Sequence, residues 1–247
     1  MQSRERQRKG FKRMFHRRLE AVIFDCDGVL VDSEPLHYRA FQAVLVPLGL
    51  AHSYDDYLER FIGFDDRDAF LEVFREKGLE LDDTRLAGLI RSKEAVLQGI
   101  IAQGVVGFPG VVPLVQELAA NRVPLAVASG ALRREVEAFI EALGVAGCFS
   151  VIVAADEVVR SKPHPETYLK ALEHLRSDGA IKALDPKSCI AIEDTPAGIA
   201  SAGEAGLYVI GVTNSFPEDQ LLSADHVVVS LEELSLSRML ELVGKGN

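Results

Sequence analysis

Short apolar segments alternate with amphipathic segments along the carboxyl-terminal half of the chain. Val123 to Ala128 (VPLAVA) is typical of a buried strand, and residues 131–143 then place apolar side chains at the spacing of one helix face. A further helix is expected to begin near Pro165, because proline suits the first helical turn. Four more apolar segments continue the pattern: Phe149 to Ala154, Cys189 to Ile192, Tyr208 to Val212 and Val227 to Val229.

Alternating strands and helices predict an α/β fold with a doubly wound, Rossmann-like parallel sheet. Short, nearly all-apolar strands indicate a sheet that is covered by helices on both faces. Leu19 to Phe24, far earlier in the chain, has the same apolar character. We expect it to be a strand of the same sheet.

Residues 34–105 do not follow this alternation. Apolar residues recur at helical spacing from Leu86 to Ile101, and Asp66 to Lys77 has a helical pattern that Gly78 would end. No convincing strand pattern interrupts them. The segment is therefore expected to be helical throughout.

The chain is thus predicted to hold two domains. The α/β core is expected to comprise residues 19–33 and 106–247, with residues 34–105 inserted as a helical cap domain. The expected hinges are Val31 to Ser33 and Val105 to Gly110 (VVGFPG).

Composition narrows the class of protein. The chain has 247 residues, of which 48% are hydrophobic and 26% charged, as in ordinary globular proteins. Its net charge of -10 argues against nucleic-acid and anionic-membrane partners, and no apolar run reaches the roughly 18 residues of a membrane span. Three scattered cysteines, Cys26, Cys148 and Cys189, do not form a disulfide framework or a zinc motif. They indicate a reducing compartment, and the predicted location is cytoplasmic.

The first 18 residues differ from this average. Eight of them are Lys or Arg, and Glu5 is the one acid among them. The favoured interpretation is a disordered tail, with organellar targeting or a nucleic-acid arm left open as alternatives.

Polar residues that could act in catalysis or binding follow the predicted strands. Ligands of an open parallel sheet gather at the carboxyl ends of its strands. The residues at those ends are Asp25 and Asp27, Ser129 and Gly130, and Glu193 and Asp194, with Lys162 in the loop SKPHP. Together they predict one site at one edge of the sheet.

Each feature alone has an ordinary interpretation. Asp25-Cys26-Asp27-Gly28 resembles the start of a calcium loop, but that loop has its glycine sixth and follows a helix. Ser129 alone would be a helix N-cap, and Lys162 alone a solvated lysine. Glu193 and Asp194 alone would favour a helix amino terminus electrostatically. Their convergence at one edge favours a functional site.

Crowded carboxylates need a cation, and an all-oxygen ligand set selects a hard one such as Mg²⁺. Magnesium leaves room for waters and a phosphate. Lys162 is expected to offset part of the remaining charge and to keep Asp25 ionised. Ser129 and backbone N–H groups at a helix start are expected to hold phosphate oxygens. The predicted site therefore handles phosphate.

These motifs, in this order, resemble those of the haloacid dehalogenase-like hydrolase superfamily. FDCDGVLVDSE is similar to its first motif, ASG to its second, KPHP to its third, and EDT followed by AGI to its fourth. The similarity covers residues 19 to about 230 and is greatest to the branch of β-phosphoglucomutase and small-molecule phosphatases. In that family the helical insertion is a small cap domain.

The resemblance implies roles for the site residues. Asp25 would be the nucleophile that forms an aspartyl-phosphate, and Asp27 the acid/base. The implied Mg²⁺ ligands are Asp25, the backbone carbonyl of Asp27, Glu193 and Asp194. The implied phosphate-binding residues are Ser129, Gly130 and Lys162. Asp32 is assigned to loop structure and Cys26 to buried apolar packing.

Other proteins with acidic phosphate sites fit less well. A response-regulator receiver has its acid pair first in the chain and its phosphorylated aspartate later, and it has no helical insertion. A dehalogenase of the same superfamily would lack Asp27 and the magnesium ligands. A non-catalytic binding protein on this fold would be expected to have lost Asp25 or Asp27. The prediction is therefore an enzyme that transfers a phosphoryl group.

Phosphatase and phosphomutase are the two remaining alternatives. His37 falls where β-phosphoglucomutase has a histidine, which favours a mutase. The mutase loop K-G-x-S-R is replaced here by Ile62-Gly63-Phe64-Asp65-Asp66-Arg67, so a cationic contact is lost. A mutase must hold a doubly phosphorylated intermediate, so this loss favours a phosphatase.

The predicted enzyme is thus a magnesium-dependent phosphatase of a small phosphorylated metabolite, such as a sugar phosphate. His37 and Arg67 of the cap domain are expected to contact the substrate. A monomer is expected, with a homodimer as the alternative.

Overall fold

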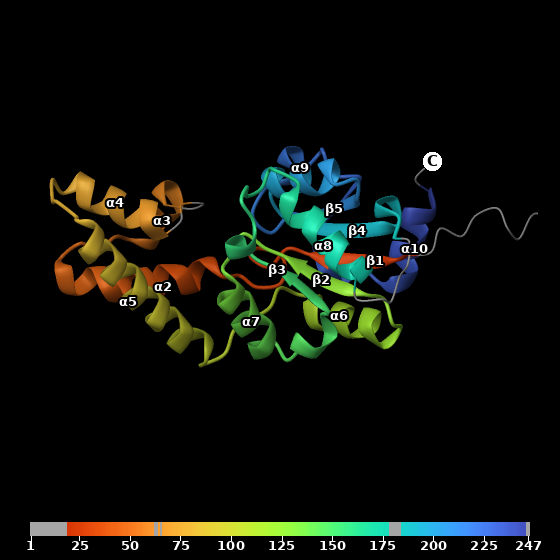
Figure 1. The fold of residues 1–247 in the computed structure, drawn as a ribbon, viewed down its shortest axis with the longest axis horizontal. Coiled ribbons are helices and arrows are strands. Elements are labelled where there is room, and N and C mark those ends of the chain that lie inside the picture. Colours follow the sequence, from red (N-terminus) through yellow and green to blue (C-terminus); the bar gives the residue numbers. More distant parts are fainter. Residues whose placement is uncertain (1–18, 62–63, 65, 178–183, 246–247) are drawn as a thin grey trace, which may run out of the picture. The chain divides into compact units, whose positions relative to one another are not determined.

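The computed structural model describes residues 19–61, 64, 66–177 and 184–245. The predicted basic tail, residues 1–18, lies outside this described part. The chain divides into two compact units, shown in Figure 1. We call Met1–Val31 with Gly107–Asn247 the core domain, and Asp32–Val106 the helical domain.

The core domain is built on a six-stranded sheet in the order β3-β2-β1-β4-β5-β6. Every neighbouring pair of strands is parallel. The strands are β1 (Ala21–Phe24), β2 (Leu125–Ala128), β3 (Val151–Val153), β4 (Cys189–Glu193), β5 (Tyr208–Val212) and β6 (His226–Val228). This sheet confirms the predicted α/β fold class.

Helices cover both faces of the sheet. Figure 1 shows α8 and α9 on one face and α6 and α7 on the other, and α10 contacts α6. The helices are α6 (Val111–Ala120), α7 (Arg133–Ala142), α8 (Glu166–Ser177), α9 (Pro196–Glu204) and α10 (Leu236–Lys245). Two covered faces explain why the strands are apolar at almost every position.

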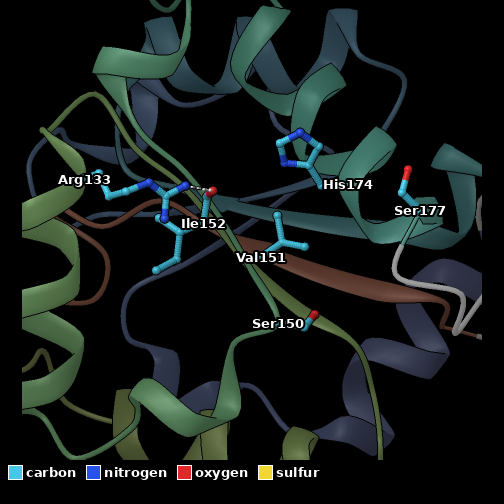
Figure 2. A pocket seen from close by; sticks show the side chains of 6 residues that line it. All are labelled: Arg133, Ser150, Val151, Ile152, His174 and Ser177. Carbon is cyan, nitrogen blue, oxygen red and sulfur yellow. Dashed lines mark hydrogen bonds between the residues drawn. The ribbon is translucent and has the colours of Figure 1, made fainter.

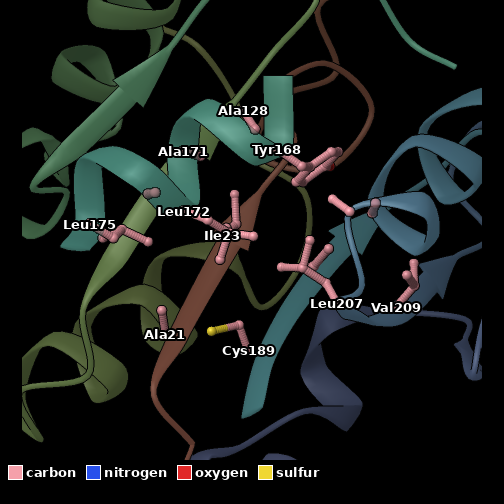
Figure 3. Close-up of a cluster of buried hydrophobic side chains, with 14 of the residues drawn as sticks. Ala21, Ile23, Ala128, Tyr168, Ala171, Leu172, Leu175, Cys189, Leu207 and Val209 are labelled. Atoms are coloured by element: carbon pink, nitrogen blue, oxygen red, sulfur yellow. The ribbon is translucent and has the colours of Figure 1, made fainter. Parts of the chain in front are cut away.

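Alternation along the strands decides which side chains meet α8 and α9. Ala21 and Ile23 of β1, with Cys189 and Ala191 of β4, belong to the hydrophobic cluster that these helices complete. Figure 3 shows this cluster, with Tyr168 of α8 at one end of it. Because successive strand residues point to opposite faces, the next odd-numbered position of each strand continues on this face.

Several strand ends differ from the prediction, for local reasons. The predicted strand from Val123 begins at Leu125, because Pro124 has no N–H and the N–H of Val123 donates to Leu118 O at the end of α6. The last strand ends at Val228, because the N–H of Val229 donates to the side chain of Glu233.

The helical domain has its own core. Its helices are α2 (Glu34–Leu45), α3 (Tyr54–Arg60), α4 (Asp66–Glu76) and α5 (Asp83–Ile101). Aromatic side chains dominate this core, and the rings of Phe41 and Phe70 lie 4.8 Å apart between centroids. Ser53 and Asp82 cap the amino ends of α3 and α5 by accepting backbone N–H groups. No strand occurs among the described residues of this domain.

No described helix has both the length and the apolar composition that a membrane crossing requires.

Candidate active site

The carboxylates at the ends of β1 and β4 lie on the same face of the sheet. Asp25 follows Ala21 and Ile23 along β1, and Glu193 follows Cys189 and Ala191 along β4. By strand alternation both carboxylates lie on the face covered by α8 and α9. The strands are neighbours, with Phe24 opposite Ile192, so the two carboxylates come together at the carboxyl edge of the sheet.

Asp25, Glu193 and Asp194 form a buried cluster of carboxylates. Their ligand atoms all lie within 4.8 Å of one another. Burial, and then the charge of Asp25, raises the pKa of Glu193 to about 8 and that of Asp194 to about 7. Such shifts show that the site tolerates its negative charges poorly unless a positive charge is near.

Lys162 is the positive group of this cluster. Its Nζ lies 2.9 Å from Asp25 Oδ1 and 2.6 Å from Glu193 Oε1. Burial would lower the pKa of Lys162, but the two carboxylates raise it above its ordinary value. The expectation that Lys162 keeps Asp25 ionised holds only in part. Burial raises the pKa of Asp25, the charge of Lys162 lowers it and the charge of Asp27 raises it again, so that the pKa ends above its ordinary value.

Ser129, which follows the end of β2, contacts Asp27 beside the cluster. Its hydroxyl donates to Asp27 Oδ2 over 3.4 Å, and it accepts the N–H of Ala131 at 2.9 Å. Ser129 is buried and Gly130 is exposed. The helix that follows begins at Arg133, later than predicted, so Ser129 sits in a turn before the helix rather than at its N-cap.

The structure therefore brings together the core residues singled out from the sequence. Asp27 is half-buried, and its charge raises the pKa of Asp25 further, although its carboxylate is outside the cluster of three. Cys26 is fully buried, as predicted, and its N–H donates to Asp25 Oδ1 at 2.8 Å.

Sequence reasoning missed two residues that touch this cluster. The hydroxyl of Tyr168 donates to Glu193 Oε1 at 2.5 Å. Ser215 hydrogen-bonds Asp194 and lowers its pKa against the effect of burial. Ser215 lies just beyond the end of β5, so the rule that pointed to the other strand ends also applies to it. Tyr168 gave no such signal, because it lies on the apolar stripe of its helix.

The residues present fit a hard divalent cation. Among the described residues, Glu193 Oε2 and Asp194 Oδ1 are buried oxygens without a hydrogen-bond partner. Three carboxylates and one ammonium leave two negative charges, and the donors are all oxygens, as Mg²⁺ requires. A side chain at Gly28 would fill this space, because a Cβ there would lie 1.8 Å from Asp194 Oδ2.

His37 and Arg67 lie in the helical domain. His37 Nδ1 is 2.8 Å from Nζ of Lys93, a buried lysine of α5 whose Nζ also lies 2.6 Å from Asp66 Oδ1. Burial, and then the charge of Lys93, lowers the pKa of His37 to about 3. Arg67 is exposed and lies 3.7 Å from Asp83. Lys93 was not singled out, although a lysine on the apolar stripe of a helix is a recognisable signal.

Part of the loop used to separate phosphatase from mutase is outside the described residues. Ile62, Gly63 and Asp65 belong to that part. Phe64 is exposed, and its N–H donates to Phe61 O at 3.0 Å. The argument from the missing lysine therefore stays one from the sequence.

A second hollow of the core domain lies along the free edge of β3 (Figure 2). Its volume is about 470 Å³, and it is lined by Arg133, Ser150, Val151, Ile152, His174 and Ser177. The guanidinium of Arg133 already donates to Ile152 O at 2.7 Å and to Glu157. The guanidinium is thus already paired within the protein, and none of the lining residues is a carboxylate. This hollow is not the candidate active site.

Comparison with known proteins identifies the class of enzyme. The sequence model of the haloacid dehalogenase-like hydrolases matches residues 22–212, and the chain belongs to this family. Protein CbbY of Rhodobacter capsulatus is 36% identical over 234 residues, which cover 91% of this chain and 99% of that protein. The phosphorylated carbohydrates phosphatase of Thermotoga maritima is 30% identical over 227 residues, 91% of this chain and 100% of that protein. These relatives confirm the predicted class, a phosphoric monoester hydrolase of this family.

Solved structures agree with this assignment. The crystal structure of CbbY from Rhodobacter sphaeroides in complex with phosphate has a TM-score of 0.77 and 28% identity, covering 90% of this chain and 99% of that one. β-Phosphoglucomutase from Clostridium difficile has a TM-score of 0.74 and covers 91% of this chain and 97% of its own. At 23% identity, the mutase shows a shared fold.

Proposed function

We propose that this protein is a magnesium-dependent phosphatase of a small phosphorylated metabolite, with a sugar phosphate as the favoured class. The observation that carries the proposal is the buried trio Asp25, Glu193 and Asp194, which has two unpartnered oxygens and Lys162 beside it. The names of the relatives support the substrate class, since one of them is a phosphorylated carbohydrates phosphatase.

In the proposed reaction Asp25 attacks phosphorus and forms an aspartyl-phosphate, while the bond from phosphorus to the ester oxygen breaks. Asp27 gives a proton to that leaving oxygen and then accepts one from the water that hydrolyses the intermediate. Ser129 and Lys162 bind the oxygens of the phosphoryl group in transit, with Gly130 next to them. Each turnover returns Asp25 as a carboxylate and releases an alcohol and inorganic phosphate.

Asp25, Glu193 and Asp194, with the backbone carbonyl of Asp27, would hold the magnesium ion. When bound, the ion supplies positive charge that offsets the clustered carboxylates and the phosphate. Without that charge, the pKa values of Glu193 and Asp194 stay raised. Positioning and charge stabilisation are the main sources of rate in phosphoryl transfer.

A phosphomutase is the second candidate, and His37 is the residue that favours it. The absence of a lysine before Gly63 favours hydrolysis over transfer back to substrate. We further propose a cytoplasmic location and a monomer. The three cysteines are free thiols, which agrees with a reducing compartment.

The decisive experiment is a screen of sugar phosphates and other phosphomonoesters with Mg²⁺, in which free phosphate and isomerised product are both measured. Wild type should release phosphate, excess chelator should abolish this, and added Mg²⁺ should restore it. Asp25→Asn should remove turnover and leave the circular dichroism spectrum unchanged. Normal turnover by folded Asp25→Asn would overturn the mechanism, and faster isomerisation than phosphate release would establish the mutase.

A further inference from the structure

The side chain of Glu193 is held in place by hydrogen bonds and by burial. It is fully buried, and its Oε1 accepts two hydrogen bonds, one from Lys162 Nζ at 2.6 Å and one from the Tyr168 hydroxyl at 2.5 Å. Its Oε2 has no partner among the described residues. Of the two oxygens of this carboxylate, Oε1 is fully hydrogen-bonded, whereas Oε2 accepts no hydrogen bond from the described residues.

Tyr168 contacts Glu193 from α8, in the helical layer that covers this face of the sheet. It lies in the first turn of α8, is fully buried, and belongs to the hydrophobic cluster of Figure 3. Its ring also lies beneath Lys162, with Nζ 5.3 Å from the ring centroid. A phenylalanine would supply the same ring, so the hydroxyl has no packing role. Its one hydrogen bond in the described structure goes to Glu193.

Gly198 lies against the carboxylate of Glu193. It lies in α9, and a Cβ at this position would be 1.9 Å from Glu193 Oε2 and 2.1 Å from its Cδ. The helix backbone therefore packs directly against the carboxylate. Any larger residue at position 198 would displace the whole carboxylate, because its Cβ would also lie 2.3 Å from Oε1.

We propose that Tyr168 and Gly198 are positioning residues that fix the orientation of Glu193 and so present Oε2 to a divalent cation. The tyrosine hydroxyl and the lysine ammonium occupy Oε1, which leaves Oε2 as the oxygen without a hydrogen-bond partner among the described residues. Gly198 supplies the space that this orientation needs. The inference rests on the proposed magnesium chemistry and extends it to two residues outside the ligand set.

The test uses Tyr168→Phe, which removes the hydroxyl and keeps the ring beneath Lys162. Mg²⁺ binding to the full chain is measured by isothermal titration calorimetry without substrate. Loss of a hydrogen bond that orients a metal ligand should weaken Mg²⁺ binding by about 10-fold or more. The matched control is Tyr57→Phe, which deletes a hydroxyl that donates to Glu34 Oε2 at 2.9 Å in the helical domain. This control should bind Mg²⁺ as wild type does.

Gly198→Ala is the second test, with Gly203→Ala as its control in the same helix. A Cβ at Gly203 meets nothing within 4 Å. Both substitutions add the same methyl group to α9, but only the first displaces Glu193. Mg²⁺ binding should weaken by about 10-fold or more in Gly198→Ala and stay unchanged in Gly203→Ala.

Activity separates positioning from a general loss of stability. For Tyr168→Phe, the Mg²⁺ concentration at half-maximal activity should rise, while kcat at saturating Mg²⁺ stays within about 3-fold of wild type. A merely structural role would lower the thermal midpoint in chelator and leave the Mg²⁺ dependence unmoved.

Equal Mg²⁺ affinity in wild type and Tyr168→Phe, or no Mg²⁺ binding by wild type, would overturn this inference. The proposed function fails by a different result, namely wild type that binds Mg²⁺ and releases no phosphate from any ester. In that case the calorimetric comparison still decides whether Tyr168 and Gly198 position Glu193.

Discussion

Asp27 is the residue at which chemistry is most cleanly separated from binding. As the proposed acid/base it moves protons, whereas Ser129 and Lys162 are proposed to bind the phosphoryl group. Asp27→Asn should therefore slow turnover by about 10²–10⁴ and leave substrate binding nearly intact. Single-turnover kinetics and competitive binding with inorganic phosphate measure the two effects.

The control for this change is Asp32→Asn. Asp32 is an exposed loop residue and the last aspartate of the same motif, so its substitution should leave the rate unaltered. An unchanged rate in Asp27→Asn would assign proton transfer to another group.

His37 gives a pH-dependent prediction. Its pKa in the folded protein is about 3, lowered from 6.5 by burial and then by Lys93. Below pH 6.5 His37 becomes protonated in the unfolded chain but stays neutral in the folded chain. The free energy of unfolding therefore falls as the pH drops. Between pH 6.5 and 5 this contribution is at most about 2 kcal/mol. Urea unfolding at pH 7 and pH 5 should show a smaller fall for His37→Gln than for wild type.

Glutamine is chosen because it is uncharged in this pH range and keeps an acceptor for Lys93. His226→Gln, the same change in the core domain, controls for loss of a histidine elsewhere. If wild type and His37→Gln lose the same unfolding free energy, His37 does not stay neutral in the folded protein.

At the scale of residues, sequence reasoning found the charged groups whose positions along the chain indicate a chemical role. Asp25, Glu193 and Lys162 are charged residues next to apolar strands or in a loop at the sheet edge, which is where ligands gather. Tyr168 could not be found in this way. Its ring satisfies the apolar stripe of α8, and only the three-dimensional structure shows that its hydroxyl meets Glu193.

The loop after β1 carries the prediction at the scale of elements. Gly28 has a φ of 75°, and a Cβ there would also lie 1.8 Å from Asp194 Oδ2. Gly28→Ala should therefore combine backbone strain with displacement of a magnesium ligand. We expect a stability loss of about 1–2 kcal/mol from the left-handed backbone, and in addition a loss of Mg²⁺ binding.

Gly144→Ala separates these two effects. Gly144 has a φ of 71°, and a Cβ there meets nothing within 4 Å. This variant should show the strain without the loss of Mg²⁺ binding. Thermal unfolding and calorimetry of both variants measure the difference. Equal Mg²⁺ affinity in the two variants would contradict the role of Gly28 as space for Asp194.

Element types were predictable because the periodicity is strong, whereas element ends depend on local hydrogen bonds. The apolar run from Val123 continues through Pro124, but a strand cannot use a residue without an N–H. The helix expected from residue 131 begins at Arg133, because the N–H of Ala131 donates to Ser129 Oγ. That bond involves a site residue, so the discrepancy lies where sequence patterns carry least information.

At the scale of the whole molecule, the two domains divide the chemistry. The core domain holds the buried carboxylates and Lys162, and nothing in the described helical domain duplicates that cluster. The helical domain holds instead His37 and Arg67, the two residues proposed to contact the substrate. We propose that the core domain handles the phosphoryl group and that the helical domain selects the rest of the substrate.

This division predicts how substitutions in the helical domain affect different esters. His37→Ala and Arg67→Ala should reduce kcat/KM for the preferred sugar phosphate by about 10-fold or more, because each would remove a proposed polar contact to a substrate group. Hydrolysis of a small generic ester such as p-nitrophenyl phosphate should change less than about 2-fold, since such an ester requires little beyond the phosphate site. Arg91→Ala, an exposed arginine of α5, is the control and should alter neither rate. Equal losses on both esters would mean that these residues support the fold or the chemistry, and substrate selection would then have to be sought within the core domain.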